Sequence, residues 1–269
     1  MPQITAQNET VRAFKGIHLY HAGWSNCSMR VRLTLEEKGL AWTSHHLDTR
    51  VGEHITAEYF AIHPYGLVPA LVHDGDVWIE SSDIIRYLDD TFPEPRLTPA
   101  DDEGLKKLAE WRKLASEIHV SAVKTYVYAS GANNRRRKSS AELQHYRSLQ
   151  TNDELLEFHA RSSSATGITS QDLATAEKLL QVAFTRLDQH LGAHEWLAGN
   201  QFTLADITWV PLHYTLEQVG FSFAPYPNVL TWVRKIAERP SFNKAVVEWF
   251  KGPRDMVQSV GVDRPGNKA

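Results

Sequence analysis

The 269-residue chain has 42% hydrophobic and 23% charged residues and a formal net charge of −3 at pH 7, an ordinary globular composition with room for two domains. The near balance of charge gives no general attraction to nucleic acid or to an anionic membrane. No apolar run approaches the roughly 18 residues of a membrane span, and the N-terminus lacks the apolar centre of a secretory signal. One cysteine excludes an internal disulfide and favours the reducing cytoplasm, and 13 scattered histidines without ligand spacing indicate no metal site.

The first half of the chain alternates strand-like and helix-like segments. Gly39 follows a stretch of good helix formers and is the residue type most often found just past a helix end. The run Asp74-Gly75-Asp76 separates two short apolar segments, which is typical of a hairpin turn. The expected order is βαβαββα, with strands at 16–20, 43–47, 68–72 and 77–79 and helices at 25–38, 53–61 and 83–88.

Three closely spaced prolines punctuate the middle of the chain and mark a linker. Beyond them apolar residues recur at helical spacing, so the second half is expected to be all-α. The expected division is an N-terminal tail over 1–15, an α/β domain over 16–92, a linker over 93–104, a helical domain over 105–250 and a C-terminal tail over 251–269.

Within the second half, the segment 131–167 is polar and poorly patterned, and we expect an irregular or mobile excursion there. It carries four consecutive cations at 135–138. Such a run is typical of a solvated helix face or loop, and the alternative is a site for an anionic partner.

The first candidate functional feature is the run Ser25-Asn26-Cys27-Ser28 at a loop-to-helix transition. Free backbone N–H groups and the positive end of the helix dipole stabilise an anion at such a place. A thiolate is such an anion, and a serine hydroxyl or cysteine thiol there can hydrogen-bond it. The alternative is an N-cap cluster that contains a buried, inert cysteine.

Two further features accompany this run. Val68-Pro69 lies between a loop and a strand, where a cis peptide bond would turn the backbone of the preceding residue toward a ligand. Glu80-Ser81 precedes a helix, so Ser81 offers a donor to a carboxylate and Glu80 offers an acceptor to an ammonium. A γ-glutamyl group carries both. An ordinary trans proline and ordinary helix capping are the alternatives.

Together these motifs resemble the glutathione transferase superfamily over roughly residues 17–250. The resemblance implies a thioredoxin-like α/β N-terminal domain followed by an all-α helical domain, with glutathione as cosubstrate. Thr203 would cap a helix in the second domain, with Asp206 reaching back to it. The matching segments are 25–30, 35–40, 63–71, 80–85, 196–206, 227–232 and 239–242.

Within the superfamily, the motif around Cys27 is similar to that of glutathione-dependent tetrachlorohydroquinone reductive dehalogenases. Those enzymes carry a cysteine at this position and a comparable polar insertion. Bacterial β-etherases and the ganglioside-induced differentiation-associated protein are further relatives by resemblance. Leu67 departs from the pattern, because the family often has lysine or glutamine at this position, two residues before the proline. Glu80 is the acidic residue that the wider superfamily carries and that the dehalogenases commonly lack.

The resemblance implies a transferase in which the thiolate of glutathione attacks a hydrophobic, aromatic electrophile, with reductive dehalogenation and aryl-ether cleavage as options. The sulfur is expected at Ser25, Asn26, Cys27 and Ser28. The rest of glutathione is expected at Val68, Pro69, Glu80, Ser81, Arg50 and His54, and the electrophile at Trp24, Trp111, His119, Tyr126 and Tyr128.

Cys27 leaves two mechanisms open. A serine can assist the thiolate of glutathione, or Cys27 can attack the sulfur of a glutathionyl-substrate conjugate and form a mixed disulfide that a second glutathione resolves. The alternative function is a non-catalytic binding or stress-sensing module. The family resemblance also implies a cytoplasmic homodimer that takes a small-molecule substrate, and nothing in the sequence selects among electrophiles.

Overall fold

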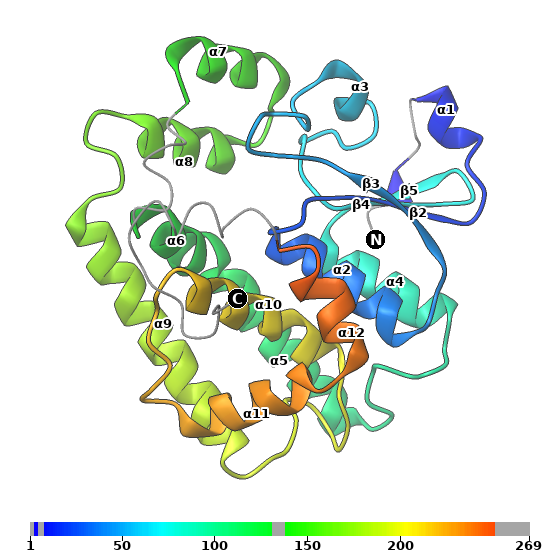
Figure 1. The fold of residues 1–269 in the computed structure, drawn as a ribbon, viewed down its shortest axis with the longest axis vertical. Helices are drawn as coiled ribbons and strands as arrows, with labels where there is room; N and C mark the ends of the chain where they lie inside the picture. Colours follow the sequence, from blue (N-terminus) through cyan, green and yellow to red (C-terminus); the bar gives the residue numbers. More distant parts are fainter. Residues whose placement is uncertain (1–2, 5–7, 131–137, 251–269) are drawn as a thin grey trace, which may run out of the picture.

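The chain forms a small mixed sheet with helices on it, followed by a larger helical unit (Figure 1). The computed structural model describes residues 3–4, 8–130 and 138–250. The first unit comprises β1 (Gln3–Ile4), α1 (Glu9–Arg12), β2 (Ile17–His21), α2 (Asn26–Glu37), β3 (Trp42–His46), α3 (Ala57–Phe60), β4 (Ala70–His73), β5 (Asp76–Trp78) and α4 (Ser81–Thr91). The second comprises α5 (Asp102–Ile118), the π-helix η1 (His119–Lys124), α6 (Thr125–Ala129), α7 (Ser140–Leu149), α8 (Asp153–Ser163), α9 (Ser170–Leu191), α10 (Leu204–Gln218), α11 (Pro227–Ala237), α12 (Pro240–Phe242) and the π-helix η2 (Asn243–Val247). The predicted fold class is confirmed.

Five strands form one sheet in the order β1-β5-β4-β2-β3. β3 pairs in parallel with β2, which requires the crossover through α2, whereas β4 and β5 form an antiparallel hairpin. The sheet is covered on both faces. Leu19 of β2 belongs to the main core together with Leu33 of α2, while Val72 of β4 packs in a smaller core with Val11 and Tyr59 from α1 and α3. The predicted order of elements from the second strand onward is confirmed.

Residues 3–4 and 8–15 belong to this unit and are not a tail. β1 pairs antiparallel with β5, and Val11 is buried. Asn8 caps α1 by accepting hydrogen bonds from the backbone N–H groups of Thr10 and Val11. A two-residue strand and a one-turn helix are too short to leave a periodic signal in a sequence, so the prediction of a tail over 1–15 is wrong here. The predicted tail over 251–269 lies outside the described residues.

The segment predicted to be irregular contains two regular helices, α7 and α8. Ser139 and Asn152 cap them through side-chain hydrogen bonds. The pair lies beside α3 in Figure 1, and Gln150 Nε2 donates to the carbonyl of Tyr65 at 2.6 Å. Polar amphipathic helices gain their stability from such tertiary contacts, which the sequence pattern does not reveal. Of the four-cation run, only Lys138 lies within the described residues.

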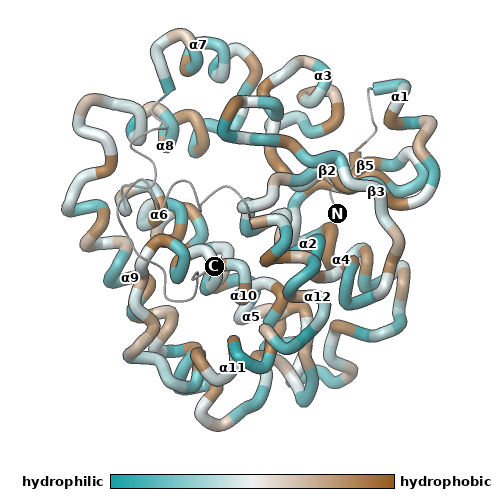
Figure 2. The backbone as a smooth tube through the Cα atoms, in the orientation of Figure 1, coloured by the Kyte–Doolittle hydropathy of each residue, from teal (hydrophilic) through white to brown (hydrophobic). Residues whose placement is uncertain are grey.

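The helical unit buries one face of most of its helices. Figure 2 shows hydrophobic and hydrophilic residues alternating along them, as one buried face requires. α10 is the exception, since nearly all of its residues are buried against α2 and α5. Within the described residues, no helix has both the length and the apolar composition to cross a membrane.

α10 begins at a buried capping box. The carboxylate of Asp206 accepts hydrogen bonds from the backbone N–H groups of Leu197 and Thr203, at 3.1 and 2.9 Å, and from Trp232 Nε1 at 2.8 Å. Burial raises the pKa of Asp206 to about 6, although the hydrogen bonds oppose this shift. The predicted cap by Thr203 and the return contact of Asp206 are confirmed.

Asp206→Ala should lower the free energy of unfolding by about 3 kcal/mol or more, because it leaves three buried donors without an acceptor at about 1–3 kcal/mol each. Asp172→Ala is the matched control. It removes the same kind of carboxylate from the exposed capping box of α9 and should cost about 1 kcal/mol. Urea titration of both variants measures the difference, and equal losses would contradict the role of burial.

Candidate functional site

A cavity of about 530 Å³ lies where the two units meet. Its walls come from the loop before α2, the first turns of α2 and α4, η1 and α6, and the α7–α8 pair. Of the predicted site residues it brings together Trp24, Ser25, Asn26, Cys27, Arg50, His54, Val68, Glu80, Ser81, His119 and Tyr128. The other four do not line it: Ser28, Pro69, Trp111 and Tyr126.

The start of α2 presents hydrogen-bonding groups to this cavity. Ser25 is the N-cap, and its Oγ accepts a hydrogen bond from the Ser28 N–H at 3.3 Å, which leaves the hydroxyl proton to be donated to an anion. Asn26 Oδ1 accepts a hydrogen bond from the Thr215 hydroxyl of α10. Ser28 is fully buried, and its Oγ accepts from the Ala22 N–H at 3.3 Å. The expectation that Ser28 meets the sulfur is therefore corrected, because its hydroxyl secures the loop instead.

Arg32 holds the loop before α2 in place. Its buried guanidinium donates to the carbonyls of Ala22 and Gly23, at 3.0 and 2.7 Å, and to the carbonyl of Ala245 in η2 at 2.7 Å. It also donates to His21 Nδ1 at 3.0 Å. Burial and the neighbouring guanidinium lower the pKa of His21 to about 2, so this imidazole is neutral and accepts. The loop is thereby fixed against the C-terminal end of the described chain.

Cys27 lies between an imidazole and a buried guanidinium. Its Sγ is 4.0 Å from His119 Nδ1. Burial lowers the pKa of His119 to about 3, with Arg30 adding to the shift, so the ring is neutral at pH 7. Arg30 Nε donates to the carbonyl of Thr208 at 3.2 Å, while its buried Nη2 has no hydrogen-bond partner within the described residues. The sulfur therefore lies beside a buried positive charge and a neutral imidazole.

The opposite wall carries the second and third predicted features. The Val68–Pro69 peptide bond is cis, which decides between the two isomers that the sequence left open, and Val68 lines the cavity while Pro69 leads into β4. Glu80 has a φ of 64°, a left-handed conformation that is strained for a non-glycine residue. Burial raises the pKa of Glu80, with Asp83 adding to the shift. Ser81 is the first residue of α4, so its side chain and the helix start face the same space.

Arg50 and His54 lie at the rim of the cavity, on the segment between β3 and α3. The Arg50 guanidinium forms a two-pronged pair with Asp48, with Nε–Oδ1 at 2.9 Å and Nη2–Oδ2 at 2.7 Å. A carboxylate that bound Arg50 would therefore share it with Asp48.

Two residues predicted to contact the electrophile belong to the helical core. Trp111 packs edge-on against Trp209 of α10, and Tyr126 packs edge-on against Phe221. Helical spacing identifies apolar faces but not the neighbour that each face meets, so Trp111 and Tyr126 were wrongly assigned to the cavity.

Among the cavity residues that sequence reasoning missed, five have basic or aromatic side chains. Arg30 is three residues after Cys27 on one helix face, a spacing that would have identified it. Lys124 is five residues after His119, a spacing that a π-helix aligns and an α-helix does not. The other three lie on or beside the helices that were expected to be irregular. The five are Arg30, Lys124, Lys138, Tyr146 and His159.

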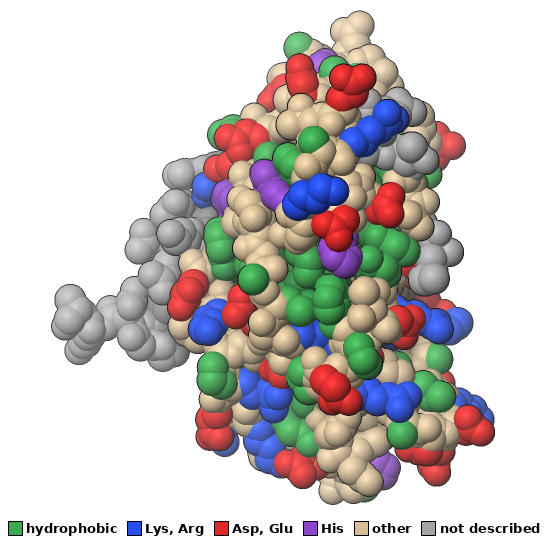
Figure 3. All heavy atoms as spheres, turned by 90° about the vertical axis from the view of Figure 1, so that its right-hand side faces the viewer, with side chains coloured by type: hydrophobic (Ala, Val, Ile, Leu, Met, Phe, Trp, Pro, Cys, Tyr) green, Lys and Arg blue, Asp and Glu red, His purple; other side chains and the backbone are tan. Residues whose placement is uncertain are grey.

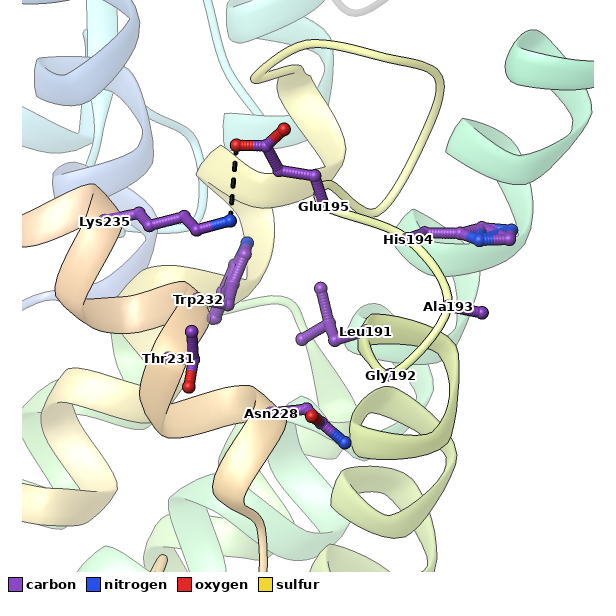
Figure 4. A pocket seen from close by; sticks show the side chains of 9 residues that line it. All are labelled: Leu191, Gly192, Ala193, His194, Glu195, Asn228, Thr231, Trp232 and Lys235. Carbon is purple, nitrogen blue, oxygen red and sulfur yellow. Dashed lines mark hydrogen bonds and ion pairs between the residues drawn. The ribbon is translucent and has the colours of Figure 1, made fainter.

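A smaller cavity of about 240 Å³ lies at the other end of the helical unit, between the end of α9 and α11 (Figure 4). Lys235 and Glu195 form an ion pair at its edge, with Nζ and Oε1 3.2 Å apart. It contains none of the predicted site residues. Within the described residues, no group of three or more histidine, cysteine or acidic side chains could hold a metal ion. The interdomain cavity is the candidate site because it brings together eleven of the predicted site residues.

Comparison with known families identifies both units. Residues 24–91 match the family model described as the glutathione S-transferase N-terminal domain. Residues 151–240 match the model described as the glutathione S-transferase C-terminal domain. The two matched segments cover more than half of the chain and include the start of α2, the β4–β5 hairpin and α10.

Individual relatives are similar over nearly their whole length. Protein LigF of Sphingobium sp. is 29% identical over 237 residues, which cover 85% of this chain and 92% of that protein. Glutathione S-transferase TCHQD of Arabidopsis thaliana is 25% identical over 249 residues, which cover 88% of this chain and 92% of that protein. The crystal structure of the β-etherase LigF from Sphingobium sp. superposes with a TM-score of 0.76 at 29% identity, covering 87% of this chain and 98% of that chain. A theta-class glutathione S-transferase from Xanthomonas axonopodis pv. citri, solved with glutathione bound, superposes with a TM-score of 0.64 at 22% identity. The match covers 87% of this chain and 98% of that chain, and at this identity it supports the fold alone.

Gly23→Ala should displace the start of α2, because a Cβ at this position would overlap the carbonyl oxygen of Trp249. Gly39→Ala is the control, since a Cβ there meets nothing within 4 Å and only the positive φ of 61° opposes it, at roughly 1–2 kcal/mol. We expect Gly23→Ala to lose stability by more than Gly39→Ala and to lose the ligand-binding activity that Gly39→Ala retains. Thermal unfolding and glutathione-affinity retention measure both effects.

Proposed function

Because the chain belongs to the glutathione S-transferase superfamily, whose members use glutathione as cosubstrate, we propose that glutathione binds in the interdomain cavity and attacks a small aromatic electrophile there. The observation that carries this proposal is that the capped start of α2 and the start of α4 line one cavity. The α2 end supplies Ser25 and Cys27, and the α4 end supplies Glu80 and Ser81.

Each part of glutathione has a chemically matched group in this cavity. The γ-glutamyl ammonium fits the Glu80 carboxylate, and the γ-glutamyl carboxylate fits the Ser81 hydroxyl and the helix start. The backbone of Val68 is the proposed partner of the central peptide. The glycyl carboxylate is directed to the rim, where Arg50 and His54 lie. The thiol then reaches the start of α2.

The start of α2 can supply the free energy needed to form a thiolate. Lowering the pKa of a thiol by two units requires about 2.7 kcal/mol of preferential stabilisation of the anion. One hydrogen bond from Ser25 to the charged sulfur contributes about 1.5–3 kcal/mol, and the helix dipole contributes about 0.3–1 kcal/mol. The buried guanidinium of Arg30 adds a favourable charge, so a reactive thiolate is expected near neutral pH.

The proposed reaction is displacement at an electrophilic carbon. The thiolate sulfur forms a C–S bond, and the leaving group departs with the electron pair of the bond that breaks. A halide and a phenoxide are both suitable leaving groups. The similarity to LigF, a β-etherase, at 29% identity over most of both chains supports aryl-ether cleavage as the first reaction to test.

Cys27 supports a second chemistry, because its sulfur lines the cavity beside His119. Its thiolate would attack the sulfur of a glutathionyl-substrate conjugate, forming a disulfide with glutathione as the C–S bond breaks. The substrate carbon would keep the electron pair and take a proton. A second glutathione thiolate would then release Cys27 and form glutathione disulfide.

Ser25→Ala should raise the pKa of bound glutathione by about 1–2 units, because it removes a charge-assisted hydrogen bond of about 1.5–3 kcal/mol. The rate with 1-chloro-2,4-dinitrobenzene near neutral pH should fall about tenfold or more. Ser121→Ala, an exposed helical serine, is the control. Ultraviolet absorbance of the thiolate gives the pKa. If wild-type protein neither binds immobilised glutathione nor turns over any electrophile, the non-catalytic alternative is correct.

Cys27→Ala separates the two chemistries. Turnover of an aryl ether or chlorodinitrobenzene is expected to persist in this variant, since Ser25 remains. Turnover of a chlorinated hydroquinone is expected to stop at the glutathionyl conjugate if Cys27 performs the thiol exchange. Intact-protein mass spectrometry should then find a glutathionyl adduct on the wild type and none on the variant. Full reductive turnover by Cys27→Ala would exclude the redox role.

We also propose that the protein is a cytoplasmic homodimer. Members of the superfamily are typically dimers, and Figure 3 shows hydrophobic side chains gathered in the middle of one face with acidic and basic side chains around them. Sedimentation at several protein concentrations tests the dimer, and a monomer at all concentrations would contradict it.

A further inference from the structure

We infer that the electrophile carries an anionic group, a phenolate or a carboxylate, which the Lys124 side chain receives at the inner end of the cavity. This inference rests on the proposed function, because it assigns the substrate class of the same site. The inner end, here called the cationic lobe, is formed by Lys124, Tyr128, Lys138, Tyr146 and His159.

Lys124 lines the cavity but has no anion of its own. Its Nζ lies 4.3 Å from the ring centroid of Phe158 and 5.9 Å from that of Tyr128, both within cation–π range. Within the described part of the chain it has no hydrogen bond and no ion pair. Burial lowers the pKa of Lys124 to about 8, although Cys27 and Glu154 oppose the shift, so the side chain stays largely protonated at pH 7. A buried ammonium without a counter-ion is unfavourable, and a bound anion would remove that cost.

A second lysine side chain belongs to the lobe. Lys138 also lines it, with Nζ 5.3 Å from the ring centroid of Tyr146. Burial lowers the pKa of His159 to about 2, so this ring adds no charge at pH 7. The one acidic residue that lines this end among the described residues is Glu142, whose carboxylate accepts from the Ser139 N–H in the capping box of α7. Hydrogen bonds from Ser139 lower the pKa of Glu142, and Lys138 adds to the shift, so Glu142 offsets part of the charge of Lys138 but not the excess of the two lysines. The lobe is therefore cationic when the cavity is empty of ligand.

Glutathione does not account for these cations. In the proposed binding mode its carboxylates lie toward α4 and the rim, and its thiolate lies at the start of α2 beside Arg30. The lobe belongs to η1, α6, α7 and α8, the wall that the second substrate would meet. Lys124 is thus the cation that an anionic group on that substrate would meet.

Aromatic side chains lie in and beside the lobe. Tyr128 and Phe158 meet edge-on at 4.9 Å, and Tyr146 meets His159 edge-on at 5.2 Å. The π-helical turn of η1 aligns residues five apart, so Lys124 lines the same wall as His119 beside the Cys27 sulfur. An aromatic substrate can therefore place its reacting carbon near α2 and its anionic substituent near Lys124.

Two matched pairs of compounds test the inference. In 4-chloro-3-nitrobenzoate and 4-chloro-3-nitrobenzamide, the glutathione sulfur forms a bond to the ring carbon, chloride leaves with the electron pair, and the thiol proton goes to solvent. Wild-type protein should show a kcat/KM at least tenfold higher for the carboxylate. Calorimetry should likewise find tighter binding of 2-naphthoate than of 2-naphthamide.

Lys124→Met should reduce the carboxylate-to-carboxamide ratio of kcat/KM at least tenfold, and Lys124→Arg should restore most of it. Lys113→Met is the control, because Lys113 is exposed and pairs with Glu117 on the outer face of α5. Its ratio should equal that of the wild type.

Any of three results would overturn the inference. The first is equal binding of naphthoate and naphthamide by the wild type. The second is an equal slowing of both nitrobenzene substrates in Lys124→Met, and the third is an unchanged carboxylate-to-carboxamide ratio of kcat/KM in that variant. An equal slowing would mean that Lys124 acts on the thiolate. Failure of the proposed function would give a different result. The protein would then still bind naphthoate more tightly than naphthamide, but it would neither be retained on immobilised glutathione nor turn over either nitrobenzene substrate.

Discussion

The buried guanidinium of Arg32 is the constraint on which the site depends. Among the described residues it has no carboxylate partner, and its donors instead reach carbonyl groups of two segments far apart in sequence, Ala22 with Gly23 and Ala245. A buried cation that lost these acceptors would be strongly unfavourable, so the loop and η2 must stay together. The position of the first turn of α2 follows from that requirement.

The site is accordingly a product of both units. α2 is bonded to α10 through Asn26 with Thr215 and through Arg30 with Thr208. The front of α2 presents Ser25 and Cys27 to the cavity. This arrangement explains how an anion-stabilising helix start can be held rigidly while its hydrogen-bond donors remain directed at a ligand.

The helical unit contributes chemistry as well as support. η1 and α6 form one wall, and the α7–α8 pair, bonded to the first unit by Gln150, forms another. Neutral imidazoles and a cationic amine share these walls. Burial lowers the pKa of His119 from 6.5 to about 3 and that of Lys124 from 10.5 to about 8, so only the lysine remains largely charged at pH 7. The first unit thus defines where the sulfur lies, and the second defines which electrophile can approach it.

The sequence by itself determined the order of the elements from β2 to α4, the family resemblance, the two helix starts and the place of Pro69 before a strand, because these rest on local signals such as caps, turns and fixed motif spacing. The capping box of Thr203 and Asp206 was recognisable for the same reason. Only the tertiary structure decided that Ser28 supports the loop, that Trp111 and Tyr126 belong to the core, and that 131–167 contains docked helices where it is described. The cationic lobe was equally invisible in the sequence. Its amines lie on a π-helical turn and beside the docked helices, and burial and long-range packing, not local pattern, bring them to one cavity.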